Sequence, residues 1–465
     1  MATIIQQHPL YDTLPASQDV IFTVSNTNIV AAFTGVKMVA EVHISSGSAP
    51  NLAVPDDIVG TFKTSANNAG VGIFDFRPII ESFVKAENTA YKFARFKGIA
   101  STYNPFTIHI IDKYSRNVEP LRYMAIKFTT EYIDATGTLV VDNTQDNSLL
   151  YKVFNGYLKY NDELDIISNN FGYNIEKFQL QSGLIGGRFL TNAPTTQYAN
   201  AEDYGTLAFL TTPVSTNITN TTIDKFEIIL FDDTDTQIGA TINVDNTSAN
   251  GGWNAWNAKT DKQLMFFGCF PGNLRNTNAV FNANLANISY YYVQAKSTTT
   301  AISDRIIIYI NCPNTKGFKP IRLTWLNQWG GWDYYTFNMK SIKTTSTKGS
   351  TYQQLEGSWN ERLYRLDSFR GGKKSFRVNA TEKIKMNTDF VNESESAWFE
   401  DLINSPEVYI IEGFQTDETY SALNKYVTPV RLTTSSYTKK TIANDRLMQY
   451  TFEVEKTKTL RTQTV

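Results

Sequence analysis

Few residues in this chain are suited to acid–base chemistry. It has three histidines, His8, His43 and His109, and histidine is the usual general base near neutral pH. His43 and His109 alternate with Val and Ile in runs that predict β-strands, so we expect each to face solvent or to occupy a satisfied core position. The sequence lacks a nucleophile elbow, a phosphate-binding loop, an HExxH helix and a dinucleotide-binding glycine pattern. It therefore predicts a protein that is not an enzyme.

Carboxylates and thiols give no stronger sign of a reaction or of a bound metal. Asp232 and Asp235 could serve a glycosidase only if the fold set them across a cleft. The run Asp232–Thr236 matches half of a calcium loop, but the glycine and the distal glutamate of such a loop are missing, so a hairpin turn is predicted. Cys269 and Cys312 lack the spacing of a zinc site and are expected to be free thiols. No cofactor or metal is expected.

Six aromatic residues stand within the thirteen residues Trp325–Phe337, on either side of Gly330 and Gly331. The glycine pair predicts a tight turn between two strands, and the rings are expected to fill a β-domain core. Two other interpretations stay open, a platform that stacks on sugars and a contact between subunits. The contact candidates among the aromatic residues are Trp329, Trp332 and Tyr334, together with Trp253 and Trp256 beside a second glycine pair.

Residues 338–385 are rich in cations, with eleven Lys and Arg against four acids. Lys340–Lys348 and Arg370–Arg377 are expected to form a hairpin with Gly371 and Gly372 at its tip. A solvated face is the simplest interpretation of such a run, and docking on an acidic neighbour or on a phosphate backbone is the alternative. The cations that we single out as contact candidates are Arg370, Lys373, Lys374 and Arg377.

The composition points to association with other proteins. Charged residues make up 19% of the 465 residues and aromatic residues 13%. The chain therefore has fewer charged side chains than usual to cover a solvent-exposed surface. The net charge of −2 argues against general nucleic-acid binding. The charge is uneven, because residues 316–465 carry 22 cations and 17 acids, whereas residues 1–315 carry 21 cations and 28 acids. The sequence shows no secretion signal and no long apolar run, so no membrane partner is expected and the chain is expected to be made in a cytosol.

Hydrophobic periodicity predicts a mainly β protein with an α+β C-terminal part, built from several β-sandwich or barrel domains. The first domain is predicted to be an immunoglobulin-like sandwich, with a short helix that begins near Pro78. Strands such as Phe226–Phe231 are expected in the second domain, and a helix over Asn392–Asn404 in the third. The three predicted domains are the N-terminal sandwich 1–138, the central Asn/Thr-rich β domain 139–315, and the α+β domain 316–465, which holds the aromatic hairpin and the basic insertion.

Three parts of the sequence resemble structural tail proteins from short-tailed phages of Bacteroidetes, the crAss-like phages among them. These parts are Val36–Val42 with Gly70–Val84, Ile321–Phe337, and Trp398–Tyr409 with Pro429–Val430. The second is the most specific of the three. The resemblance implies a virion component of the tail hub or neck ring, built from β-domains that repeat around the DNA channel, and it implies no catalytic residue.

The same resemblance implies the partners and the location of the protein. The partners would be further copies of the chain in a sixfold or twelvefold cyclic homo-oligomer, neighbouring tail and portal-proximal proteins, and packaged DNA that passes without sequence-specific binding. The protein would lie in the tail of the virion after assembly in the cytoplasm of the host bacterium. A receptor- or glycan-binding tail module and a tail glycosidase are the alternatives from other functional classes.

Overall fold

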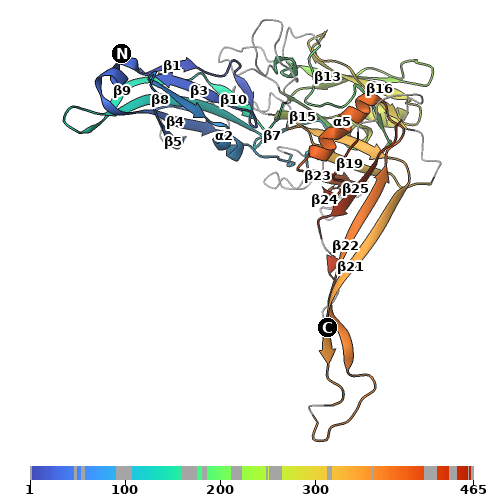
Figure 1. Ribbon diagram of the computed structural model, residues 1–465. Coiled ribbons are helices and arrows are strands. Elements are labelled where there is room, and N and C mark those ends of the chain that lie inside the picture. Colours follow the sequence, from blue (N-terminus) through green and yellow to red (C-terminus); the bar gives the residue numbers. More distant parts are fainter. Residues whose placement is uncertain are drawn as a thin grey trace. The chain divides into compact units, whose positions relative to one another are not determined.

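The structure, a computed structural model, describes residues 3–46, 50–53, 58–90, 107–158, 175–180, 186–210, 223–247, 250, 264–311, 317–358, 361–412, 427–438, 448–458 and 460–461. The chain divides into two compact units. Unit 1 is made of Met1–Cys312, Leu326–Tyr334 and Gly413–Leu423, and unit 2 of Pro313–Trp325, Tyr335–Glu412 and Asn424–Val465. Strands dominate both units and the helices are few (Figure 1), so the predicted mainly β fold with several sandwich-like sheets is confirmed.

The N-terminal part of unit 1 consists of two β-sheets. The smaller sheet has the strand order β1-β3-β6, and the larger has the order β2-β10-β8-β4-β5, with β9 paired to β8. The strands are β1 (Ile4–Gln7), β2 (Thr13–Pro15), β3 (Ile21–Ser25), β4 (Thr34–Ser45), β5 (Ile58–Ser65), β6 (Val71–Asp75), β8 (Leu121–Ile133), β9 (Leu139–Asn147) and β10 (Tyr151–Phe154). Helix α1 (Thr27–Ala32) joins β3 to β4.

Alternating side chains from both sheets meet in one core. Phe22 on β3 is fully buried, and its ring centroid lies 5.6 Å from that of Phe128 on β8 and 5.6 Å from that of Tyr151 on β10. Phe76 closes the same cluster, with its ring at 5.7 Å from Phe22. Because neighbouring residues in a strand point to opposite faces, this packing requires the alternation that the sequence shows.

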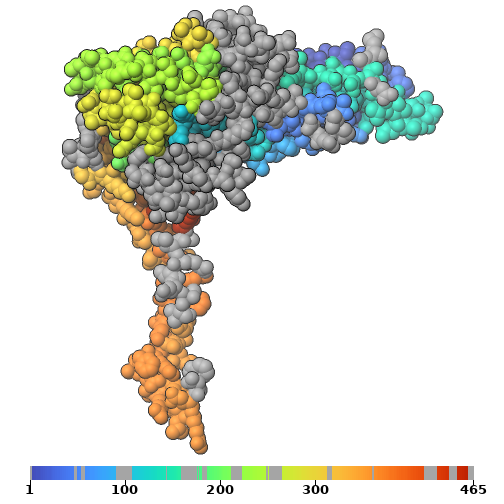
Figure 2. All heavy atoms as spheres, turned by 180° about the vertical axis from the view of Figure 1, so that it is seen from behind, coloured from blue at the N-terminus to red at the C-terminus, as the bar shows by residue number. Residues whose placement is uncertain are grey.

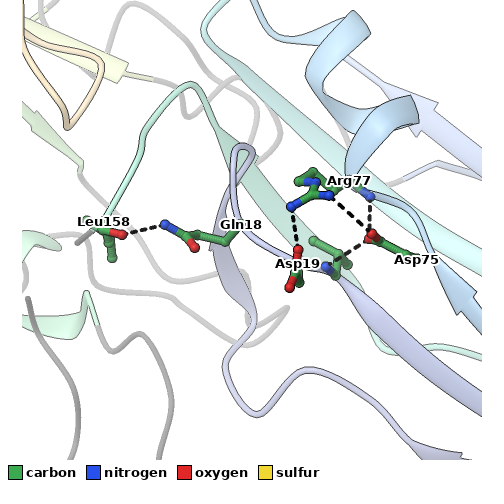
Figure 3. A network of polar contacts seen from close by, with 6 residues as sticks. Gln18, Asp19, Asp75, Arg77 and Leu158 are labelled. Carbon is green, nitrogen blue, oxygen red and sulfur yellow. Dashed lines mark hydrogen bonds and ion pairs between the residues drawn. The ribbon is translucent and has the colours of Figure 1, made fainter. Parts of the chain in front are cut away.

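Helix α2 (Arg77–Phe83) follows β6 and carries Pro78 in its first turn, as predicted, with Ile80 on its buried side. Figure 3 shows how polar groups hold its start. Asp75 Oδ1 accepts a hydrogen bond from the Arg77 amide (3.0 Å), while the Arg77 guanidinium pairs with Asp19 (2.5 Å) ahead of β3. Nearby, the Gln18 side-chain amide donates to the Leu158 carbonyl (2.5 Å). These contacts tie the helix start to the segment before β3.

The second pair of sheets in unit 1 lies in the central part of the sequence. One sheet has the order β11-β18-β16-β13-β14, with β17 paired to β16, and the other has the order β12-β15-β7. Their strands are β7 (Tyr114–Asn117), β11 (Thr196–Ala199), β12 (Thr206–Leu210), β13 (Lys225–Phe231), β14 (Ile242–Asp245), β15 (Leu264–Gly268), β16 (Tyr290–Ser297), β17 (Thr300–Ala301) and β18 (Ile306–Ile310). The helical elements here are η2 (Ile108–Ile110), η3 (Glu176–Phe178), α3 (Pro271–Thr277) and α4 (Ala279–Asn284).

Two local features differ from or refine the sequence prediction. The run Thr107–Ile111, which resembles a strand, contains the short 3-10 helix η2 instead, and all three residues of η2 are buried. The turn at Asp232 is a hairpin turn, as predicted: Asp232 Oδ1 accepts hydrogen bonds from the Thr234 and Thr236 amides (2.9 Å each). The hydrogen bond from the Thr234 hydroxyl, followed by that from the Thr236 amide, lowers the pKa of Asp232 against the opposing effect of desolvation.

Strand pairing crosses the predicted boundary near residue 138. β7 lies before that boundary and pairs with β15 of the central sheet, whereas β9 and β10 lie after it and join the N-terminal sheet. Both regions also fall within unit 1. The division into domains 1–138, 139–315 and 316–465 therefore stays a prediction.

Unit 2 is organised around one sheet with the order β20-β19-β23-β24-β25-β22-β21, and β26 pairs with β22. The strands of this sheet are β19 (Ile321–Leu326), β20 (Trp332–Phe337), β21 (Ser341–Gln354), β22 (Gly372–Asn387), β23 (Val408–Ile411), β24 (Val427–Leu432), β25 (Thr451–Lys456) and β26 (Leu460–Arg461). Leu326 of β19 and Trp332–Tyr334 of β20 belong to unit 1. Helix α5 (Glu393–Asn404) begins at the predicted cap, where Asn392 and Glu395 form a capping box. Its inner face buries Trp398, Phe399 and Leu402.

Candidate functional site

The aromatic hairpin is a core element in this structure. Its turn segment, Leu326–Tyr334, belongs to unit 1. Trp329 and Trp332 are each only 3% exposed, and Tyr334 is also buried. The Trp329 ring stacks on Phe178 at 3.9 Å between centroids, and its indole Nε1 donates to Asn192 Oδ1 (2.8 Å). These three rings are therefore packed against residues of their own chain. This burial corrects their assignment as candidates for stacking on sugars or for contact with another subunit.

Trp332 and Tyr334 pack around a buried histidine. The His109 ring meets the Trp332 ring edge-on at 5.0 Å between centroids. The Tyr334 hydroxyl lies 2.9 Å from His109 Nδ1 and 2.8 Å from Thr206 Oγ1. Trp332 Nε1 donates to the Glu87 carbonyl (3.2 Å). His109 is thus a buried core residue, held at Nδ1 by Tyr334, and this position gives it no access to a substrate.

The turn of the hairpin depends on one asparagine and on two glycines. Asn327 Oδ1 accepts hydrogen bonds from the amides of Trp329 and Gly331 (3.0 Å each), while its Nδ2 donates to the Leu190 carbonyl (2.8 Å). Gly330 has a φ of 76°, and a Cβ built on it would lie 2.4 Å from the Asn155 carbonyl oxygen. Only glycine fits this position, because the backbone is left-handed and a neighbouring carbonyl fills the space of a side chain.

The outer parts of the two hairpin strands lie in unit 2 and are equally buried. Trp325 is fully buried, and its ring centroid lies 5.0 Å from that of Trp398 on α5. Tyr335 packs edge-on against Phe399 at 4.9 Å. Burial raises the pKa of Tyr335 well above its ordinary value, so this phenol stays neutral. The hairpin is therefore part of the packed interior in both units.

The remaining candidates for chemistry give no site. Trp253, Trp256 and Cys312 lie outside the described residues. Cys269 is a buried free thiol. Within the described ranges, no cluster of three or more His, Cys, Asp or Glu side chains could hold a metal ion, and no helix of these ranges is long and apolar enough to cross a membrane.

A long two-stranded arm is the feature that best fits a functional surface. β21 and β22 pair antiparallel from Ser341–Met386 out to Gln354–Gly372 and extend past the other strands of unit 2 (Figure 1). The fourteen residues of β21 span roughly 45 Å at about 3.3 Å per residue. We call Lys340–Asn387 the arm. Gly371 and Gly372, expected at its tip, lie where β22 begins, and the described residues 355–358 and 361–370 form the tip.

Both edges of the outer arm are free of strand partners among the described residues. β21 pairs with β22 alone. Among the described residues, β22 pairs with β25 from Lys383 onward and with β26 at Asn379 and Ala380, and from Gly372 to Arg377 its strand partner is β21. Figure 2 shows the arm in orange as a slender projection. An isolated two-stranded ribbon is only marginally stable in water, and a long free edge invites pairing with another chain.

The tip of the arm exposes large apolar side chains. Five of them are between 64% and 73% exposed: Leu355, Leu363, Tyr364, Leu366 and Phe369. A group of exposed large apolar side chains in one loop often marks a site of interaction. Sequence reasoning missed them because they show no helix or strand period. Their available signal was an apolar cluster inside a cationic, otherwise polar segment.

Hydrogen bonds give this tip a defined conformation. Ser358 donates its amide to the Arg365 carbonyl (2.8 Å) and accepts from the Arg365 amide at its hydroxyl (3.1 Å). The Tyr364 hydroxyl donates to the Glu356 carbonyl (2.8 Å). Gly357 has a φ of 75°, and its backbone packs under the Tyr364 ring. The exposed rings and leucines are thus held outward by a folded loop.

The cationic candidates lie beside this tip. Arg370 is half-buried, pairs with Asp367 (3.4 Å), and places its guanidinium 5.4 Å from the centroid of Phe369. Lys373 is exposed, and Lys374 and Arg377 are half-buried. Within the described part of the chain, none of these last three forms an ion pair. The structure therefore brings the four cations together with the apolar side chains on one outer region of the arm.

Ion pairs hold the root of the arm to the sheet. The Glu382 carboxylate lies 2.9 Å from Lys343 Nζ on β21 and 2.7 Å from Lys456 Nζ on β25. Burial alone raises the pKa of Glu382, but hydrogen bonds from Lys456 and Lys343 outweigh this effect and lower the pKa below its ordinary value. Lys383 pairs with Glu453 (3.2 Å) on β25 in the same region. The root is therefore fixed, while the tip is free.

A row of rings on the outer face of the central sheet is a second surface feature. Tyr198, Tyr309, Tyr290 and Phe231 stand side by side on four neighbouring strands, with centroids 5.0 to 5.6 Å apart. The outer two pairs of the row stack, and the middle pair, Tyr309 and Tyr290, is tilted by 34°. The Tyr290 hydroxyl donates to Asp235 Oδ1 (3.0 Å).

Comparison with known proteins assigns no family to the chain. No protein-family model matches it, and no curated protein matches it. Among solved structures it is similar to E. coli alpha-2-macroglobulin in its native conformation, with 9% identity, 83% of this chain and 22% of that chain covered, and a TM-score of 0.19. It is also similar to Salmonella alpha-2-macroglobulin reacted with methylamine, with 7% identity, 97% of this chain and 22% of that chain covered, and a TM-score of 0.18. The chain spans about a fifth of the length of these proteins, and similarity this low carries no argument about function.

Proposed function

We propose that this protein is a non-enzymatic structural component of a bacteriophage virion, part of the tail hub or neck ring, that oligomerises around the DNA channel. The observation that carries the proposal is the arm, whose apolar tip and free strand edges have no partner among the described residues. An element of this kind stabilises the protein only when another surface covers it. The low charge content and the similarity of three sequence segments to phage tail proteins support the same function.

The proposed role is mechanical. Contacts between different surfaces of identical chains generate closed rings when the rotation between copies closes, and a ring leaves an axial channel. Neighbouring tail proteins would stack on this ring, and DNA would pass through it without sequence-specific contacts. Such a role needs packed, rigid domains and one or more protruding contact elements, and it needs no catalytic group.

Imaging of the purified full-length chain tests this proposal. Negative-stain micrographs together with mass photometry should show cyclic particles, of sixfold or twelvefold symmetry by the resemblance stated above. Antibody labelling of phage particles should place the protein in the tail. A chain that stays monomeric at every concentration, alone and with neighbouring tail proteins, and that is missing from virions would refute the proposal.

The row of Tyr198, Tyr309, Tyr290 and Phe231 favours one other function, glycan binding by a tail module, because tyrosine hydroxyls at an open sheet face can bind sugar hydroxyls. The buried Trp329 and Trp332 no longer support this alternative. Glycan-array binding that is lost in Tyr198→Ala and Tyr309→Ala, with assembly unchanged, would favour it over the structural role.

A further inference from the structure

Charge is divided unevenly between the arm and the rest of the chain. Residues 338–385 carry eleven cations and four acids, a net charge of +7, so the other residues together carry −9 within the total of −2. Two arms brought together repel each other, whereas an arm and the remainder of a second copy attract each other. Charge therefore favours a contact between two different surfaces of two copies over a contact between two arms.

The β8–β9 hairpin in unit 1 is the described element that best complements the arm tip. From Phe128 to Tyr151 the sequence holds four acids and no Lys or Arg. Its exposed apolar residues are Ile133, Leu139, Val141 and Leu149. Leu139 lies opposite Ile133 in the strand register, and Val141 follows two residues along on the same face. The hairpin thus combines an apolar face with negative charge, and the outer arm combines the apolar side chains of the tip with the cations Lys373, Lys374 and Arg377 beside them.

Three of the four acids of this hairpin remain available as charge. The fourth, Glu131, is neutralised by Lys63 and Lys37 on neighbouring strands. Among the described residues, no cation pairs with Asp134, Asp142 or Asp146, which accept hydrogen bonds from Thr136, Asn26 and the Ile5 amide, respectively. Hydrogen bonds from the Thr136 side chain and the Thr138 amide lower the pKa of Asp134, so this group stays ionised in mild acid.

We propose that the tip of the arm of one copy docks on the β8–β9 hairpin of a second copy. Apolar side chains of the tip, Leu363, Leu366 and Phe369, would cover Leu139 and Val141. The cations beside the tip, Lys373, Lys374 and Arg377, would face the three aspartates. This inference rests on the proposed function, because it specifies the contact between neighbouring copies in the ring. Because the two surfaces differ, the contact is head-to-tail, and each copy offers one tip and one hairpin. Such contacts extend from copy to copy until the ring closes.

A mixing experiment on the full-length chain tests this contact. The tip-blocked variant carries Leu366→Asp and Phe369→Asp, and the hairpin-blocked variant carries Leu139→Asp and Val141→Asp. Ile73→Asp, at a residue that is 58% exposed on β6, is the control for adding a charge to an exposed apolar site. Circular dichroism melting first shows that every variant keeps the wild-type melting temperature, since all five sites are exposed.

Mass photometry should find each blocked variant monomeric by itself and the Ile73→Asp control assembled like the wild type. An equal mixture of the two blocked variants should give a 1:1 dimer and nothing larger, because one intact tip and one intact hairpin remain. A tip-blocked or hairpin-blocked chain that still forms rings would overturn the docking proposal and leave the ring function standing. A wild-type chain that associates only with anionic phosphatidylglycerol vesicles, through the tip, would overturn it as well.

Discussion

Truncation of Trp332 measures how much the aromatic hairpin stabilises unit 1. Its indole is 3% exposed, packs edge-on against His109 at 5.0 Å, and donates to the Glu87 carbonyl at 3.2 Å. Replacing a buried large aromatic residue with alanine costs about 3–5 kcal/mol, since burial is lost and a cavity is left. The broken hydrogen bond accounts for about 1 kcal/mol of that cost. We therefore expect Trp332→Ala to lower the free energy of unfolding by about 4 kcal/mol.

Thermal unfolding of the full-length chain reads out this loss. At about 2–4 °C per kcal/mol, the unfolding transition of unit 1 should fall by about 8–16 °C. Trp332→Phe is the matched control, because it keeps a ring and loses only the Nε1 donor and part of the volume, so its shift should be clearly smaller. A melting temperature that barely moves in Trp332→Ala, with loss of assembly or of glycan binding, would refute the core assignment and restore Trp332 as a contact residue.

Three further predictions concern the turn, the root and the tip. Gly330→Ala should destabilise the chain by at least about 1–2 kcal/mol in urea unfolding, because its φ of 76° and the nearby carbonyl exclude a Cβ. The Glu382 ion pairs should stabilise the arm root fully above the ordinary glutamate pKa of 4.5, and this stabilisation should be lost as the pH falls through the lowered folded-state value. Amide protection factors along β22, which correct for the slower intrinsic exchange in acid, should then fall, and they should fall less in Glu382→Gln. Charge reversal at Lys373, Lys374 and Arg377 should abolish assembly and leave the fold intact. If assembly is unchanged but retention of DNA is altered and depends on the salt concentration, these cations contact DNA instead.

Sequence reasoning succeeded where local chemistry decides the structure. Helix α5 could be predicted in full because Asn392 and Glu395 form a capping box and Ser405–Pro406 follows its end. The turn at Gly330 and Gly331 could be predicted because few other residues accept such a backbone. The arm could be predicted as a hairpin from the cationic runs Lys340–Lys348 and Arg370–Arg377, although the glycine pair lies at the start of β22 and not at the tip.

Other features depend on contacts between distant residues, and the sequence does not display them. The run at His109 alternates like a strand, but its packing against Trp332 and Tyr334 favours a 3-10 turn. β7 pairs with β15, about 150 residues away, so a boundary drawn from composition separates two paired strands. Leu363, Leu366 and Phe369 could not be assigned to the surface, because apolar residues in a loop are usually buried.

The oligomeric state of the purified full-length chain tests the central claim most directly. Negative-stain imaging and mass photometry of the wild type should show cyclic particles with an open centre, and removal of the tip residues Leu355–Arg370 should reduce them to monomers that keep the fold. Wild-type particles that remain monomeric, alone and with neighbouring tail proteins, would contradict the claim that the arm is an assembly element.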